Sequence, residues 1–208
     1  YASLCKGGKM MKGLLLKDLY MAKSNILVTI VSLIVLGFGL SVLLEASALL
    51  VLAPPCATTA VFISITSDAN SKWNKNVITM PVSRSQIIGE KFILFIILSV
   101  LGIMAALIPC GVLAIFGAEM SLASLLLYGS IGVSAALFAG CFSLPCAYFF
   151  DPDKSQIVFL MSFLASTGII VALVLLINLF IPVKGNILLP FNIVLIIAAI
   201  FFFVSHKI

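Results

Sequence analysis

The stretch QIVFLMSFLASTGIIVALVLLINLFI, residues 156–181, contains no charged side chain. An α-helix rises about 1.5 Å per residue, so roughly 20 apolar residues cross the ~30 Å hydrocarbon core of a bilayer. An uncharged apolar stretch of this length predicts a membrane-spanning helix.

Five further apolar runs have the same character, at about 26–44, 48–66, 92–117, 121–150 and 187–205. The composition agrees, since 63% of the residues are hydrophobic and 9% are charged, whereas soluble proteins carry about 25% charged residues. No run lies at the N-terminus ahead of a small-residue cleavage site, as a secretory signal would. We therefore expect an all-α integral membrane protein with six spans in a single transmembrane domain over residues 1–208.

The distribution of basic residues predicts the orientation. With the N-terminus inside, the outer connections contain one basic residue, Lys184, and the cytoplasmic segments contain eleven. These are Lys6, Lys9, Lys12, Lys17, Lys23, Lys72, Lys75, Arg84, Lys91, Lys154 and Lys207. Cytoplasmic loops of membrane proteins carry such an excess, so we expect a multi-pass protein of the cell membrane with both termini in the cytoplasm. The net charge of +5 then reflects topology, and no basic patch with interleaved aromatic residues indicates nucleic-acid binding.

Residues 10–25, MMKGLLLKDLYMAKSN, are too short and too charged to span a bilayer. Their apolar side chains recur on one helical face, at Met11, Leu15, Leu19 and Ala22. This pattern predicts a helix in the inner membrane interface ahead of the first span; the alternative is a basic cytoplasmic tail without fixed structure. We expect the native start at Met10 or Met11, with residues 1–9 an extension or remnant.

Residues 67–91, SDANSKWNKNVITMPVSRSQIIGEK, hold six of the nineteen charged residues, the single Trp and the single Arg. Ser67 or Asp68 is expected to cap a short helix that ends at Pro81, and Ser83 to cap the next span. The short helix would carry an apolar stripe of Ala69, Trp73, Val77 and Met80. Connections between helices usually need only ~2–8 residues, so we interpret this amphipathic segment as a docking element on the cytoplasmic side, against membrane or partner.

The membrane runs carry no pattern of catalytic chemistry. They contain no His, Asp or Glu cluster suited to zinc and no Gly-x-Ser-x-Gly elbow, and the chain has no phosphate-binding Gly-x-x-x-x-Gly-Lys-Ser/Thr loop. We therefore expect no enzyme activity, metal or cofactor in the chain itself. Small residues recur every four positions at Gly132, Ala136 and Gly140, a stripe that predicts close packing against a neighbouring helix.

Two stretches resemble the small six-span type-2 ATP-binding-cassette (ABC) exporter permeases. The first matches the family's Met-Lys-Gly-Leu-x-x-Lys-Asp opening at Met11, Lys12, Gly13, Leu14, Lys17 and Asp18. The second matches its inner loop at Asp68, Lys72, Trp73, Pro81, Ser83, Arg84 and Lys91. In size and style the chain is most similar to the membrane subunits of phenol-soluble modulin exporters, which export amphipathic peptides.

The resemblance implies a permease that pairs with a second copy and docks a separate ATPase subunit, which binds the ATP and Mg. It implies that residues 67–91 contain a coupling helix and that membrane lipid surrounds the spans. The implied substrates are amphipathic or hydrophobic peptides, such as toxins or antimicrobial peptides. The expected ATPase contacts are Asp68, Lys72, Trp73, Lys75, Asn76 and Arg84, together with Asp151, Asp153 and Lys154 of the other inner connection.

Two alternatives stay open at this point. A self-contained secondary transporter or channel would work without an ATPase, although the spans show neither a mid-membrane charge nor a clear inverted repeat. An immunity protein would sequester a peptide without ATP-driven transport. A neighbouring reading frame that encodes an ABC ATPase would favour the exporter.

Overall fold

The computed structural model describes residues 2–40, 46–71, 84–116, 121–149, 155–180 and 188–207, and these are helical with no strand among them. The helices are α1 (Ala2–Leu40), the short 3-10 helix η1 (Ala46–Ala48), α2 (Leu49–Asn70), α4 (Arg84–Ile115), α5 (Leu122–Phe149), α6 (Ser155–Phe180) and α7 (Leu188–Lys207). Six of them are long and apolar enough to cross a membrane. The chain is therefore a multi-pass, all-α membrane protein, as its apolar runs predict.

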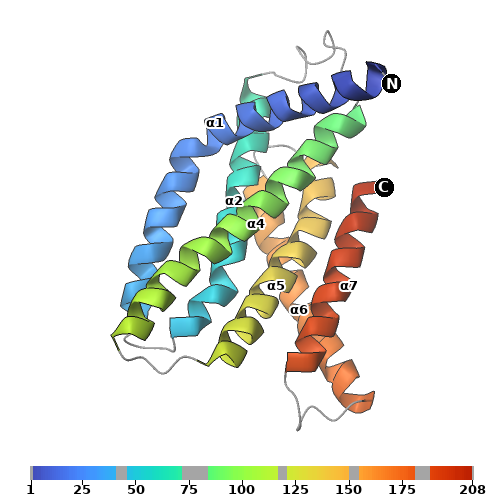
Figure 1. Cartoon of the computed structure of the whole chain (residues 1–208). Coiled ribbons are helices and arrows are strands. Elements are labelled where there is room, and N and C mark those ends of the chain that lie inside the picture. Colours follow the sequence, from blue (N-terminus) through green and yellow to red (C-terminus); the bar gives the residue numbers. More distant parts are fainter. Residues whose placement is uncertain are drawn as a thin grey trace.

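Helix α1 is longer than one crossing requires. Its 39 residues would extend about 58 Å if straight, roughly twice the hydrocarbon core. Figure 1 shows that its N-terminal part runs across one end of the bundle and that the rest turns down alongside the other helices. The predicted interfacial helix of residues 10–25 is thus continuous with the first span, and both chain termini lie at this same end of the bundle (Figure 1).

The segment between the second and third spans differs from the prediction. Ser67 and Asp68 do not cap a new helix, because α2 continues through both to Asn70, and the N–H of Ser71 donates to the carbonyl of Ser67. The helix can continue past the apolar run because Asp68 finds cationic partners inside the bundle, described below. Helix α4 begins at Arg84, and the predicted stop at Pro81 and cap at Ser83 lie outside the described residues.

The centre of the bundle is formed by α2, α4 and α5, with α7 packed against α5. Aromatic rings fill it: the Phe62 and Phe159 ring centroids are 4.8 Å apart, and those of Phe92 and Phe202 are 5.0 Å apart. Such tilted ring pairs add to the stabilisation from burial. The apolar core thus joins all the central spans.

The small-residue stripe of α5 faces this interior. A Cβ on Gly132 would overlap the carbonyl oxygen of Leu50 in α2, and a Cβ on Gly140 would lie 2.7 Å from the Phe95 ring of α4. Ala136, between them, is fully buried. The absence of larger side chains therefore allows α5 to approach both neighbours closely.

The outer faces are apolar as well. Large hydrophobic side chains are exposed along α1, α6 and α7, among them Val35, Leu164 and Phe203. A soluble protein rarely exposes so much apolar surface. In a bilayer these faces contact lipid or another membrane helix without cost.

Candidate functional site

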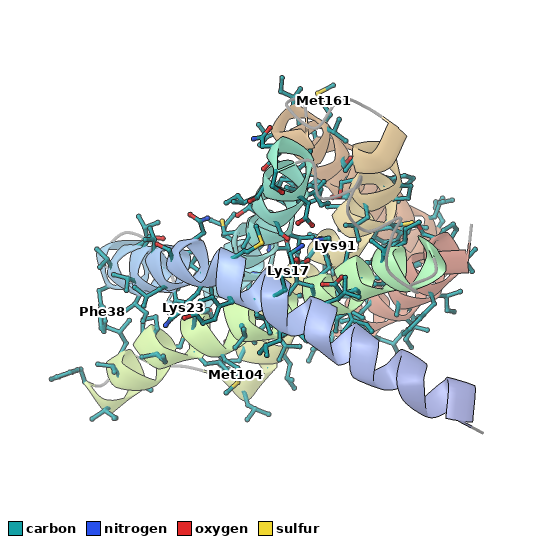
Figure 2. All side chains as sticks on the ribbon, turned by 90° about the horizontal axis from the view of Figure 1, so that it is seen from above. Lys17, Lys23, Phe38, Lys91, Met104 and Met161 are labelled. Atoms are coloured by element: carbon teal, nitrogen blue, oxygen red, sulfur yellow. The ribbon has the colours of Figure 1, made fainter. Side chains whose placement is uncertain are left out.

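A cluster of charged side chains is buried where α1 crosses the end of the bundle. The Lys91 ammonium of α4 forms ion pairs with the carboxylates of Asp18 in α1 and Asp68 in α2, with Nζ 2.8 Å from Asp68 Oδ2. The side chains of Lys91 and Asp18 are 4% and 1% exposed. Figure 2, the view from above, shows Lys17 and Lys91 close together beneath the crossing part of α1. One buried ammonium thus joins three helices.

Two further groups complete the polar contacts. Lys17 Nζ lies 2.5 Å from Asp68 Oδ1 and 3.4 Å from Asp18 Oδ1. Lys91 Nζ also donates to Ser64 Oγ at 2.9 Å, one turn before Asp68 on α2. Each carboxylate therefore forms ion pairs with two lysines, which offsets the cost of removing these charges from water.

Glu90 adds a third carboxyl group to the cluster. It is 1% exposed, and its Oε1 has no hydrogen-bond partner among the described residues. None of the ion pairs among those residues involves Glu90. The ion pairs of the cluster therefore join two lysines to two aspartates, and Glu90 is a buried carboxyl group next to Lys91 in the sequence.

Local sequence places these side chains inward. Asp18 lies three residues after Leu15 and four before Ala22, on the stripe by which α1 packs against the bundle. Lys91 lies three and four residues before the fully buried Leu94 and Phe95. At these spacings helical residues share one face, so each charged group extends an apolar stripe and must meet its partners in the interior.

The cluster connects two helices that are consecutive in the described chain. Asp68 lies near the end of α2 and Lys91 near the start of α4, and their side chains form an ion pair. Lys91 also pairs with Asp18 of α1. One cluster therefore joins the ends of α2 and α4 to α1.

Residues 13–208 match the family model described as ABC-2 family transporter protein. The chain belongs to the ABC-2 transporter family. The match covers every transmembrane helix and the whole ion cluster. Neither the curated proteins nor the solved structures gave a significant match.

Membership assigns this ABC-2 chain the role of a membrane permease domain rather than a nucleotide-binding domain, and permeases of this family work in general with an ATPase partner.

The structure places only part of the predicted ATPase contact set of this ABC-2 permease. Asp68 points into the bundle, where two lysines pair with its carboxylate. Arg84 is the first residue of α4. The remaining members lie outside the described residues: Lys72, Trp73, Lys75, Asn76, Asp151, Asp153 and Lys154. Their contacts with an ATPase stay predictions.

The sequence pattern does not identify the cluster as a site. Lys17 and Lys91 count there only toward the orientation and the family motifs, Asp18 is only a motif residue, and Glu90 has no role. The partners are 73 residues apart for Asp18–Lys91 and 23 for Asp68–Lys91, so no local spacing predicts the pairs. One signal was present: Asp18 lies on the same helical face as Leu15 and Ala22, and a charge within an apolar stripe indicates a buried partner.

Proposed function

We propose that this chain is the permease subunit of an ABC exporter. It pairs with a second copy, and a separate ATPase subunit that binds ATP and Mg docks on the cytoplasmic segment 72–83. The machine expels amphipathic or hydrophobic peptides, including toxins or antimicrobial peptides. Both termini and the ion cluster face the cytoplasm in this proposal, as the excess of lysine at that end supports.

The observation that carries the proposal is the three-helix ion cluster at the two ends of segment 72–83. Membership in the ABC-2 family supplies the expectation of an ATPase. An ATPase acts on its permease only through cytoplasmic surfaces, and this segment is the longest connection between the described helices, since α2 ends at Asn70 and α4 begins at Arg84. The ion pairs of Lys91 with Asp18 and with Asp68 supply a rigid route from that surface into the spans.

The physical basis of the coupling is the cost of separating buried charges. Removing one partner from a buried ion pair typically costs ~3–5 kcal/mol, because the other charge stays buried and uncompensated. Apolar contacts between helices can slide at much lower cost. If the ATPase displaces segment 72–83, the ends of α1, α2 and α4 that meet at the ion cluster would therefore move as one body. The halves of these helices away from the cluster would be free to rearrange.

The substrate proposal rests on the outer surface and the connections. The outer connections are short, as in EAS at 45–47 and PVKGN at 182–186, so no extracellular domain is present between the spans to select a soluble ligand. Exposed apolar side chains along α6 include Leu160, Leu164 and Leu175. Cargo that already lies in the inner leaflet could approach such a bundle laterally, which favours amphipathic peptides over hydrophilic solutes.

The test is reconstitution in liposomes with and without the cognate ATPase. We expect efflux of an amphipathic helical peptide only when the ATPase and Mg-ATP are present, and loss of copurification when Trp73→Ala is combined with Lys72→Glu. The proposal fails if the two proteins assemble unchanged in that variant, or if a hydrophilic solute is transported in preference.

One observation favours a secondary transporter as the second candidate. Four buried charged residues, Asp18, Asp68, Glu90 and Lys91, lie within helices long and apolar enough to span the membrane, and charges there often mark ion or proton pathways. Efflux by the chain alone, driven by an ion gradient without ATP, would establish that candidate in place of the exporter.

A further inference from the structure

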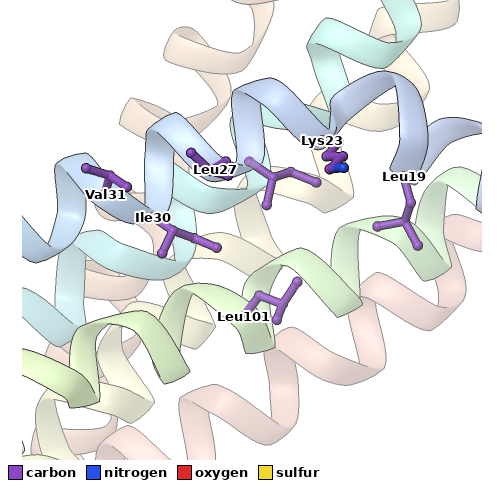
Figure 3. Close-up of a pocket in the computed structure, with 7 residues that line it drawn as sticks. Leu19, Lys23, Leu27, Ile30, Val31 and Leu101 are labelled. Carbon is purple, nitrogen blue, oxygen red and sulfur yellow. The ribbon is translucent and has the colours of Figure 1, made fainter.

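An apolar groove of about 330 Å³ opens between α1 and α4, and none of its lining residues belongs to the ion cluster. Its walls are built from Leu19, Leu27, Ile30 and Val31 of α1 and Leu101 of α4. Figure 3 shows Leu19 and Ile30 pointing toward α4 and Leu101 pointing back toward α1. The volume is within the range of small-ligand sites.

One charged group lies along this groove, between Leu19 and Leu27 (Figure 3). Lys23 lines it, is exposed, and forms no ion pair with a carboxylate of the described residues. Its ammonium lies 5.7 Å from the centre of the Tyr20 ring, and Tyr20 is 77% exposed. A lysine beside an exposed tyrosine is typical of the membrane–water interface.

With Lys23 at the membrane–water interface, the groove would extend from that interface into the hydrocarbon core of the bilayer. From Lys23 to Val31 the helix advances eight residues, or about 12 Å. The lining beyond Lys23 is entirely apolar. A ligand that fits must therefore place a negative charge at Lys23 and hydrocarbon along Leu27 and Val31.

We propose that the α1–α4 groove binds an anionic phospholipid, with the headgroup phosphate on Lys23 and one acyl chain along the groove. A phosphate matches the Lys23 ammonium, which has no ion pair among the described residues, and an acyl chain needs no hydrogen-bond partner in an apolar channel. An extended peptide segment would bring backbone N–H and C=O groups that this lining cannot satisfy. A second copy of the chain would present no phosphate to Lys23.

The experiment measures lipid binding by native mass spectrometry of the whole chain, extracted in detergent and titrated with phosphatidylglycerol or phosphatidylcholine. We expect one phosphatidylglycerol to bind more tightly than the rest, and Lys23→Gln to weaken that first site about fivefold, as for one lysine near an anionic surface. Leu27→Trp, which fills the groove, should remove the site. The matched control Leu175→Trp, at an exposed position of α6, should retain it.

A second control distinguishes lipid binding in the groove from attraction to any positive charge on this part of α1. The double variant Lys23→Ser with Ser24→Lys keeps the net charge but turns the ammonium by ~100° around the helix. Weakened binding in this variant supports the groove, and unchanged binding overturns it. Equal binding of phosphatidylcholine and phosphatidylglycerol would also contradict the proposal. So would a shift from dimer to monomer in Leu27→Trp with an unchanged number of bound lipids, because that result would assign the groove to a second copy of the chain.

Discussion

Lys91 and Asp68 lie at opposite ends of the connection between α2 and α4, yet Lys91 Nζ is 2.8 Å from Asp68 Oδ2. The same ammonium pairs with Asp18 of α1. A single side chain therefore fixes the relative positions of three helices at the end of the bundle where both termini lie (Figure 1).

Removing this ammonium should destabilise the protein strongly. Lys91→Met keeps most of the side-chain volume but leaves Asp18 and Asp68 without their shared partner. We expect a loss of ~3–5 kcal/mol, visible as a lower midpoint of thermal unfolding in detergent. Leu164→Met, at an exposed position of α6, is the control: it introduces the same side chain without removing a buried charge and should change the midpoint little.

Asp18 and Glu90 are both buried, but they differ in their ion pairs, which gives an asymmetric prediction. Glu90→Gln keeps the shape of a side chain that forms no ion pair among the described residues, so the free energy of unfolding should change by less than ~1 kcal/mol. Asp18→Asn removes a negative charge and leaves Lys91 undercompensated, so the loss should be severalfold larger. Unfolding curves of the two variants under the same conditions decide the point. Equal losses would contradict the dominant role of the Asp18–Lys91 pair.

The close approach of α5 to α2 can be tested at one glycine. Gly132→Ala would place a Cβ against the Leu50 carbonyl oxygen and 3.0 Å from Val51 Cα. Because backbone cannot move aside as a flexible side chain does, we expect destabilisation of ~1–3 kcal/mol. Gly129→Ala, on the same helix with nothing within 4 Å of the added Cβ, should be neutral or stabilising. A harmless Gly132→Ala would refute the close helix contact.

Coupling within the cluster is measurable by a double-mutant cycle. Asp68→Asn and Lys91→Met should each destabilise, and the double variant should lose less than the sum. We expect a coupling energy of ~0.5–3 kcal/mol, the usual range for residues in direct contact. Additive losses would mean that the two side chains do not interact in the membrane.

The six spans were predictable because each is encoded locally, in a run of apolar residues such as 156–181. The inward position of Asp18 was also encoded locally, since it shares a helical face with Leu15 and Ala22. The pairing of Asp18 with Lys91 was not, because it depends on how α1 crosses the bundle. For the same reason Asp68 was mistaken for a candidate helix cap: from sequence alone, a carboxylate after an apolar run resembles a helix start.

The most direct test of the coupling role is the number of peptides exported per ATP hydrolysed, measured in the same proteoliposomes. Asp68→Asn is the suitable variant, since Asp68, with its side chain 12% exposed, is less buried than Asp18 or Lys91. With folding and ATPase assembly verified, we expect hydrolysis to persist while export per ATP falls at least about tenfold, the effect of ~1.4 kcal/mol. An unchanged ratio in a folded, assembled variant would contradict the role of the ion cluster in coupling.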